Sequence, residues 1–267
     1  MAISSTLKTM GWIAPLDEWR TLIRLFGPPR IAMAEMYGDD TTGARFDHGA
    51  LDTLLRTHVR ANGRVDYAVM ADRVDQLDHY IGSIADVDFA ALSRDEKLAL
   101  LINAYNAFTL RLIAEYRPLR SIRNIPNRER WSVRRWRIGD TVLSLYDIEN
   151  TWLRARFVEP RIHFAINCAS IGCPPLRAGA YTGATIDGDL AAHTQAVHDD
   201  ARWAQVDGDT LWLSKVYLWY AGDFVQAAGG MIEFASRYLP TVADSLAAGT
   251  PLRLRWLPYD WSLNALS

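Results

Sequence analysis

The stretch from Ser93 to Pro118 reads SRDEKLALLINAYNAFTLRLIAEYRP, and it predicts a long helix. Ser93 and Glu96 have the spacing of a capping box, in which the serine hydroxyl accepts from a free first-turn amide and the glutamate reaches back. Apolar residues then recur at helical spacing as far as Ile113. Because proline cannot continue a helix, we expect this one to end just before Pro118.

Shorter helical and extended patterns surround this helix in the sequence. Helices are expected from residue 46 to the Asn62-Gly63 turn and over 145–157, 187–199, 214–227 and 230–239. Hairpins are expected over 133–145 and 204–213, and extended segments over 162–166 and 252–257. Because strands and helices do not alternate in a βαβ order, we predict an α+β fold: a helix-rich single domain around a small, mainly antiparallel sheet.

The composition of the chain excludes several classes of protein. Hydrophobic residues make up 49% of the 267 residues, so a sizeable core is expected. The net charge of −2 argues against a nucleic-acid-binding protein, and no nucleic acid is expected as a partner. No stretch approaches the ~20 apolar residues of a membrane helix, so we expect no membrane span. The sequence leaves the oligomeric state open.

The N-terminal residues are expected to be separate from the main domain. Residues 27–45 are rich in turn-forming residues, so we divide the chain into an N-terminal extension and linker over 1–45 and a domain over 46–267. Charged residues such as Asp17 and Arg20 follow a short apolar patch, a pattern that is wrong for a secretory signal. We therefore expect a cytoplasmic protein.

Both cysteines of the chain lie in the segment RIHFAINCASIGCPP, residues 161–175. If the apolar run is a strand, it carries His163 and delivers Cys168 to a bend. That bend holds Ser170 and ends at Cys173. A thiolate is the reactive form of cysteine, and a nearby imidazolium lowers the pKa of a thiol. This spacing therefore fits a cysteine nucleophile that is activated by a histidine.

Other interpretations of this segment stay open. Cysteines are often small buried hydrophobic residues, and a strand histidine is often a hydrogen-bonded core residue. The two cysteines are compatible with one small-loop disulfide or with free thiols. One histidine and two thiolates would supply three zinc ligands, but their gaps are wider than the short spacing of common zinc sites. We expect no metal.

The predicted long helix carries polar residues on one face. Asn103 and Asn106 lie one turn apart, with Tyr105 between them and apolar residues around. A buried amide needs partners, since leaving it unpaired costs about 1–3 kcal/mol. These amides therefore either hold loop backbone in place or act in a site, where one of them orients His163 or donates to a developing oxyanion.

Near the C-terminus, the stretch from Tyr259 to Asn264 reads YDWSLN. It is either a terminal segment docked on the core, or the source of a carboxylate, Asp260, that orients an imidazole. The sequence has neither a glycine-rich phosphate loop nor a Gly-x-Ser-x-Gly motif, which argues against the common nucleotide-binding and α/β-hydrolase classes. No cofactor is expected.

Several motifs follow one another in the order of a known family. They are GRVDY (63–67), LINAYNA (101–107), LSLYDIE (143–149), LR (153–154), PRIHFAINCAS (160–170), CPPL (173–176), AY (180–181), SK (214–215), WY (219–220), DF (223–224) and YDWSLN (259–264). On these motifs, residues 46–264 resemble the family catalogued as domain of unknown function 547, DUF547. The resemblance implies a single α+β domain.

The resemblance has further implications. Many bacterial relatives carry an export signal, and some eukaryotic relatives join the domain to glutaredoxin-like or leucine-zipper segments, which hints at thiol chemistry or scaffolding. The chain departs from the family pattern at Asn150, where relatives often have histidine, and at Gly172, where a hydroxyl residue often precedes the second cysteine. If either side chain acts in relatives, this chain has lost or altered that role.

From the residues and the resemblance together we predict a cysteine-dependent enzyme, a hydrolase or an acyl or thiol transferase acting on a small or peptide-like substrate. Cys173 is preferred over Cys168 as the nucleophile, because it lies beyond the bend rather than in the strand. His163 would be the general base, and Asn103 and Asn106 would orient it or stabilise an oxyanion. The residues expected to contact substrate are Tyr105, Glu149, Asn167, Ser170, Asp260 and Trp261. The alternative is a non-catalytic domain that binds a ligand or a protein and whose cysteines are structural.

Overall fold

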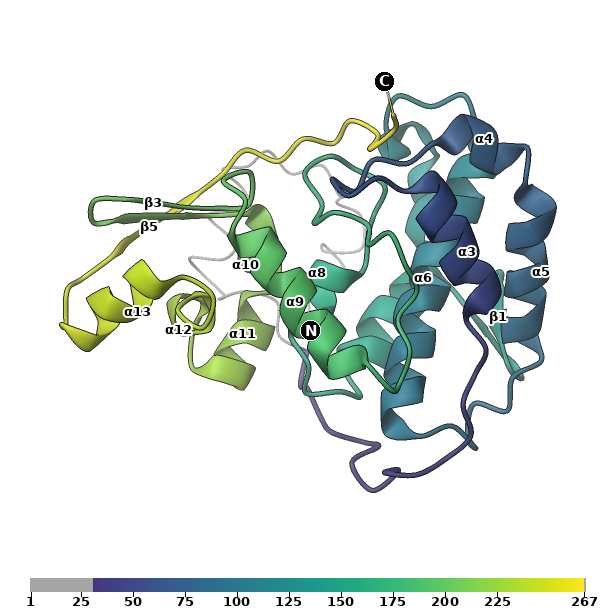
Figure 1. Ribbon diagram of the computed structural model, residues 1–267, viewed down its shortest axis with the longest axis horizontal. Coiled ribbons are helices and arrows are strands. Elements are labelled where there is room, and N and C mark those ends of the chain that lie inside the picture. The colour runs from purple at the N-terminus through teal and green to yellow at the C-terminus, as the bar shows by residue number, and fades with distance from the viewer. Residues whose placement is uncertain (1–30, 267) are drawn as a thin grey trace, which may run out of the picture.

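The computed structural model describes residues 31–266, and helix α6 (Arg94–Tyr116) lies inside the right-hand part of the molecule in Figure 1. Side chains on all faces of this helix are buried along most of its length. A helix that is enclosed all round must be covered by other elements, and elements from several parts of the chain pack against it. As predicted, the Ser93 hydroxyl caps the helix by accepting from the Glu96 amide at 3.3 Å.

The prediction that the Glu96 side chain completes the capping box by reaching back to the start of the helix is wrong. The Glu96 carboxylate bonds instead to His48 Nε2 at 2.9 Å and accepts from the Gly183 amide at 3.1 Å. Glu96 is only 2% exposed, so both bonds are shielded from water. The glutamate therefore ties two distant segments to the start of α6, because tertiary partners compete successfully with the local cap.

Elements from the N-terminal half cover one side of α6 (Figure 1). They are α3 (Gly49–His58), α4 (Tyr67–Ala71), α5 (Val74–Ala85), the 3₁₀ turn η1 (Ile122–Asn124), the π-helical turn η2 (Arg128–Ser132) and the hairpin of β1 (Trp136–Ile138) and β2 (Thr141–Leu143). After the hairpin come α7 (Leu145–Asp147) and the π-helical turn η3 (Ile148–Leu153). Apolar residues of this half, together with residues between 162 and 190 and with Leu263, form the larger of two hydrophobic clusters in the described chain.

A second, smaller hydrophobic cluster lies on the other side of the molecule (Figure 1). The elements there are α8 (Ile162–Ala165), α9 (Ile186–His198), β3 (Ala204–Asp207), β4 (Thr210–Leu213), α10 (Lys215–Trp219), α11 (Ala221–Ala228), α12 (Met231–Ala235), α13 (Pro240–Ala247) and β5 (Arg253–Trp256). Strands β3 and β4 pair antiparallel, whereas β4 and β5 pair parallel. After β5 the C-terminal segment runs back to the side of α4, so it joins the two halves (Figure 1).

The predicted α+β class is confirmed, with a single domain that has small sheets of two and three strands. Both hairpins form, and so do the helix predicted over 187–199 and the extended segment predicted over 252–257. The antiparallel arrangement holds for the hairpins only, because β5 joins the three-stranded sheet parallel to β4.

The segment over 162–166 is the short helix α8 and not the predicted strand. The His163 amide donates to the Pro160 carbonyl at 3.3 Å, as in a helical turn. An apolar run of this length carries no periodicity that separates helix from strand, so the sequence pattern was ambiguous. The helix predicted over 145–157 also differs, because α7 passes directly into the wider π-helical turn η3.

The segment that precedes α3 lies against the domain. The rings of Tyr37 and Phe157 lie 5.2 Å apart, and the buried Lys97 donates from Nζ to Asp40 at 2.6 Å. The rest of the expected extension, residues 1–30, lies outside the described residues. Within the described part of the chain, no helix is long and apolar enough to cross a membrane.

Replacing Glu96 by alanine is expected to destabilise the protein more than replacing Ser93. Ser93→Ala removes a helix cap that contributes about 1 kcal/mol. Glu96→Ala leaves buried groups of His48 and Gly183 without a partner, which costs about 1–3 kcal/mol for each group. Urea unfolding measures both losses, and the exposed Asp244→Ala serves as a control expected to change stability by less than about 0.5 kcal/mol. Equal losses for the two variants would show that Glu96 acts only as a local cap.

Candidate functional site

The segment that holds both cysteines is fixed at its start by a side chain of α6. Asn106 donates from Nδ2 to the Ala165 carbonyl at 3.0 Å, and its Oδ1 accepts from the Asn167 amide at 2.8 Å. Both halves of this buried amide are therefore used on backbone. Such bonds satisfy peptide groups that would otherwise be unpaired where α8 ends, so they fix the direction of the chain.

Asn167 braces the turn that follows, within residues 167–175, here called the cysteine loop. Its Nδ2 donates to the Pro174 carbonyl and its Oδ1 accepts from the Ala169 amide, each at 2.8 Å. Ala169 has a φ of 60°, a left-handed conformation that is unfavourable for a residue other than glycine. The brace holds this turn and brings the two ends of the cysteine loop together.

The C-terminal segment pins the far side of the cysteine loop. The Ile171 amide donates to the Ser262 carbonyl and the Gly172 amide to the Asp260 carbonyl, each at 2.8 Å. A Cβ at position 172 would lie 2.7 Å from the Asp260 amide nitrogen, so a larger residue would push the two segments apart. The close approach of these backbones explains why this chain has glycine at position 172.

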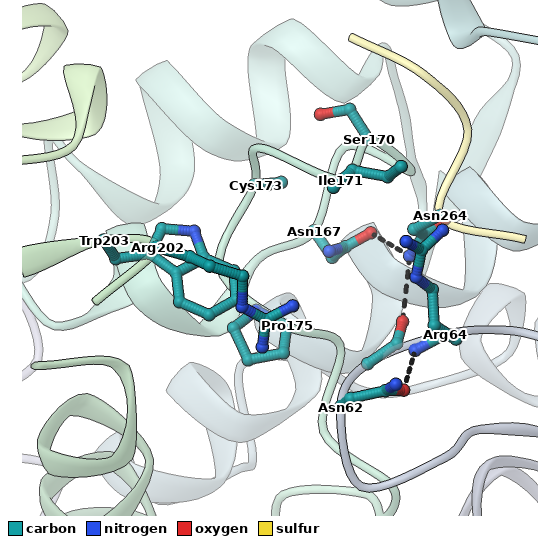
Figure 2. Close-up of a pocket in the computed structure, with 11 residues that line it drawn as sticks. Asn62, Arg64, Asn167, Ser170, Ile171, Cys173, Pro175, Arg202, Trp203 and Asn264 are labelled. Atoms are coloured by element: carbon teal, nitrogen blue, oxygen red, sulfur yellow. Dashed lines mark hydrogen bonds between the residues drawn. The ribbon is translucent and has the colours of Figure 1, made fainter. Parts of the chain in front are cut away.

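Asn264 is the third asparagine that holds the cysteine loop, and the hydrogen bonds of Asn106, Asn167 and Asn264 are here called the frame of the loop. It donates from Nδ2 to the Gly63 carbonyl at 3.1 Å and to Asn167 Oδ1 at 3.4 Å, and it accepts from the Tyr67 hydroxyl at 2.7 Å. Figure 2 shows Asn264 and Asn167 side by side at this junction. The first and last of the quoted sequence motifs therefore meet at the loop that carries the cysteines.

The frame leaves the Cys168 side chain half-buried between two hydroxyls. Its Sγ lies 3.0 Å from Ser170 Oγ and 3.1 Å from Tyr259 Oη, and these oxygens are 2.8 Å apart. The Cys173 side chain and the two hydroxyls stabilise the thiolate, so together they outweigh burial and lower the pKa of Cys168 to about 7.

Cys173 has the opposite environment. It is buried, its Sγ accepts from the Cys168 amide at 3.2 Å, and it lies 3.7 Å from the Ile166 carbonyl. The Cys168 side chain and burial raise the pKa of Cys173 well above its ordinary value. The Cys173 side chain lines a shallow hollow together with Asn167 and Asn264 (Figure 2).

A carboxylate, Glu149, forms a second polar group on the π-helical turn η3. It accepts from the Tyr105 hydroxyl at 3.2 Å and from the Tyr220 hydroxyl. Burial raises the pKa of both tyrosines, and the charges of Glu149 and Cys168 raise it further, so both phenols stay protonated. Single π-helical turns often occur at functional sites, because they reorient side chains within a helix.

His163 is sealed inside the protein. Its Nε2 lies 2.8 Å from Asp223 Oδ2, its ring stacks on that of Tyr220 with 3.8 Å between centroids, and its side chain is 0% exposed. In the described part of the chain its Nδ1 has no hydrogen-bond partner, so neither Cys168 nor Cys173 bonds to the imidazole. The predicted pairing of imidazole and thiol is therefore not formed, because α8 turns the histidine toward Asp223.

Asp223, which sequence reasoning missed, holds His163 in place. Arg154 donates to its two carboxylate oxygens at 2.7 and 2.8 Å. Burial alone would raise the pKa of Asp223, but the bonds from Arg154 and His163 outweigh it and lower that pKa to about 2. Burial lowers the pKa of His163, so the imidazole is neutral while the aspartate and arginine are charged. The sequence signal for Asp223 was the DF motif at 223–224.

Two predicted site residues bond to backbone instead. Asn103 donates to the Tyr181 carbonyl at 2.7 Å and accepts from its amide at 3.0 Å, so it holds a loop in place. Asp260 is exposed and accepts from the Ser262 amide at 2.8 Å, so it stabilises its own turn rather than an imidazole. Among residues 31–266, no group of three or more histidine, cysteine, aspartate and glutamate residues is placed to hold a metal ion.

Trp261 belongs to a group of aromatic rings beside Cys168, here called the aromatic wall (Trp219, Tyr259 and Trp261). The Tyr259 ring lies 4.7 Å from that of Trp219 and 4.6 Å from that of Trp261. All three side chains are half-buried, so part of each faces solvent. Tyr259 therefore presents its hydroxyl to the Cys168 sulfur and its ring to the wall.

Asp223→Asn is expected to destabilise the protein by about 2 kcal/mol at neutral pH, since the native pKa of Asp223 lies near 2 and its ordinary pKa is 3.8. A lowered native pKa contributes stability above the ordinary pKa and loses it as the pH falls toward the native one. The difference between wild type and variant should therefore shrink between about pH 4 and about pH 2. Urea unfolding at several pH values measures it, and a difference independent of pH would contradict the assignment.

Comparison with known proteins finds a match to a family model that covers part of the chain. No curated protein and no solved structure matches the chain. A family model described as "Protein of unknown function, DUF547" matches residues 89–196, which include α6, η3, α8 and the cysteine loop. The resemblance drawn from the motifs is thus confirmed over this range, where residues 89–196 match the model of DUF547, a family of unknown function.

Proposed function

We propose that the protein is a cysteine-dependent enzyme, a hydrolase or an acyl or thiol transferase, in which the Cys168 thiolate attacks a small or peptide-like substrate. One observation supports this above all: the half-buried Cys168 sulfur is held 3.0 Å from the Ser170 hydroxyl and 3.1 Å from the Tyr259 hydroxyl. Thiolate is the nucleophilic form of cysteine, and a thiol whose pKa is near the ambient pH is the most effective attacking group.

The two environments favour Cys168 over Cys173, although the sequence favoured Cys173. The sulfur of Cys173 is buried and its pKa is raised, so at neutral pH it stays a thiol. Cys168 is more exposed and its pKa is lowered to about 7. A nucleophile must be both ionised and reachable, and only Cys168 combines these properties within the cysteine loop.

The hydroxyl pair gives Cys168 a means to transfer protons. With a pKa of about 7, about half of the side chain is thiolate at neutral pH, so the attack needs no separate base. The leaving group must gain a proton, and the linked hydroxyls of Ser170 and Tyr259 lie next to the sulfur to relay one from water, which leaves both hydroxyls protonated. Water would then release the acyl group in a hydrolase, and another nucleophile would accept it in a transferase.

Glu149 is the proposed base for this second step. Its two carboxylate oxygens each accept one phenol, from Tyr105 and Tyr220, which fixes the group in one orientation. It remains half-buried rather than sealed, so a water or a second substrate can reach it. A carboxylate held in this way can accept the proton of the incoming nucleophile.

His163 acts in this proposal as a positioning residue rather than as the general base. Its ring stacks on Tyr220, and the Tyr220 hydroxyl bonds to Glu149. The charged pair of Asp223 and Arg154 holds the imidazole from the other side. The histidine therefore acts on the reaction through Tyr220.

The proposed substrate contacts are the aromatic wall and Ser170.

Iodoacetamide is expected to alkylate Cys168 much faster than Cys173 at neutral pH, with a rate that rises through a midpoint near 7. The thiolate is the reacting form, so the rate follows its fraction. Peptide mass spectrometry after timed quenching measures each cysteine separately, and Cys168→Ser should remove the fast reaction. Two unreactive thiols in the folded protein would contradict the proposal and favour the alternative, a domain that binds a ligand or a protein and has structural cysteines.

Tyr259→Phe is expected to raise the pKa of Cys168 by about 1, because a hydrogen bond to the charged form is lost. The alkylation profile of this variant should shift to higher pH. Tyr146→Phe is the matched control, since this tyrosine is 49% exposed at the surface and should leave the midpoint unchanged. His163→Gln should also leave the midpoint near its wild-type value while the protein remains folded. A rise in that variant would restore the histidine as the partner of the thiol.

A further inference from the structure

The cysteine loop presents a second thiol directly beside the reactive one. Both cysteines are free, and the Cys173 sulfur accepts from the Cys168 amide at 3.2 Å. Their side chains also interact, since each changes the pKa of the other. The nucleophile requires only one reacting sulfur, so in the function proposed above the buried neighbour serves only to stabilise the Cys168 thiolate.

The frame of the loop keeps these thiols together. Asn167 joins the residue after Cys168 to the residue after Cys173, through the Ala169 amide and the Pro174 carbonyl. The ends of the loop therefore cannot separate without breaking buried hydrogen bonds. A bond between the two sulfurs would close a short loop that is already closed by this brace.

We propose that Cys168 is an oxidation site for hydroperoxides, and that Cys173 is the resolving thiol that converts the oxidised Cys168 into an intramolecular disulfide. The proposal rests on Cys168 being the reactive thiol, as in the function proposed above. Low-pKa thiols that are reachable from solvent and lie next to a second cysteine are the usual sites of such oxidation.

The first step oxidises Cys168 and reduces the hydroperoxide. The thiolate attacks the terminal oxygen of the peroxide, a sulfur–oxygen bond forms, and the oxygen–oxygen bond breaks with its electron pair. The products are the Cys168 sulfenic acid and an alcohol, or water when hydrogen peroxide is the oxidant. The alkoxide that leaves, or hydroxide when hydrogen peroxide is the oxidant, takes a proton that the hydroxyl pair of Ser170 and Tyr259 beside the sulfur relays from water, so the pair ends the step protonated.

The second step joins the sulfurs. Cys173 attacks the sulfenic sulfur, the disulfide bond forms, and the hydroxyl group leaves as water with the proton of the Cys173 thiol. The charge of Cys168 is one cause of the raised pKa of Cys173. That charge disappears when the sulfenic acid forms, so the first oxidation makes the second thiol easier to ionise. The disulfide blocks the nucleophile, and a reducing thiol restores it.

The test treats the folded full-length protein with hydrogen peroxide, blocks free thiols with iodoacetamide, and measures intact and peptide masses without reduction. In wild type we expect one peptide pair that is linked between Cys168 and Cys173 and that dithiothreitol separates. In Cys173→Ser we expect Cys168 to be trapped by dimedone as sulfenic acid and then to over-oxidise. In Cys168→Ser the remaining thiol should stay unoxidised under the same conditions. Circular dichroism checks that each variant is folded.

The outcomes separate this inference from the proposed function. Rapid alkylation of Cys168, with over-oxidation instead of a disulfide in wild type, would overturn the resolving role and leave the nucleophile in place. A disulfide between two chains, seen as a dimer on a non-reducing gel, would also overturn it. Slow alkylation of Cys168 would instead contradict the proposed function. Wild type alone decides the question if a variant fails to fold.

Discussion

Three buried asparagines hold the cysteine loop, and the candidate site depends on them. Asn106 fixes the entry to the loop, Asn167 braces it internally, and Asn264 ties it to the C-terminal segment. Leaving a buried amide without a hydrogen-bond partner costs about 1–3 kcal/mol. Conformations of the loop that break these bonds are therefore disfavoured. Because all three side chains bond to backbone or to one another, the loop adopts one conformation that includes the left-handed Ala169.

The site lies where the two hydrophobic clusters meet. Tyr259 packs on the smaller cluster and Trp261 on the larger one, so the C-terminal segment spans both. The buried ion pair of Arg154 and Asp223 joins the same two halves and carries His163 with it. Charges buried in this way are retained only when they are paired, so the pair fixes the relative position of the halves. The polar contacts of Cys168 and of Glu149 are therefore each made to residues of other segments, Tyr259 and Tyr220, which no single element could supply.

Sequence reasoning succeeded where local chemistry decides the structure. The long helix, its Ser93 cap and both hairpins follow from periodicity and turn residues, and the clustering of both cysteines in one segment is visible in the printed sequence. The backbone-holding interpretation of Asn103 and Asn106 matches their contacts. These features depend on residues that are close together in the sequence, so the sequence pattern predicts them directly.

The failures concern contacts between residues far apart in the chain. Glu96 leaves its local cap for His48, and His163 pairs with Asp223 instead of a thiol. The partner of Cys168, Tyr259, lies 91 residues away, and no spacing rule predicts that distance. The choice between the two cysteines likewise depends on burial and on neighbouring hydroxyls, which only the folded chain brings together.

The most direct test of the account is an ultraviolet titration of the thiolates in the native protein, with the curve of Cys168→Ser subtracted. The account predicts that one thiolate appears with a midpoint near 7 and that this component is absent from the variant. A single midpoint at the ordinary thiol value of about 8.5, shared by both cysteines, would contradict it. In that case the hydroxyls of Ser170 and Tyr259 would not stabilise a charge, and the cysteine loop would be a structural element alone.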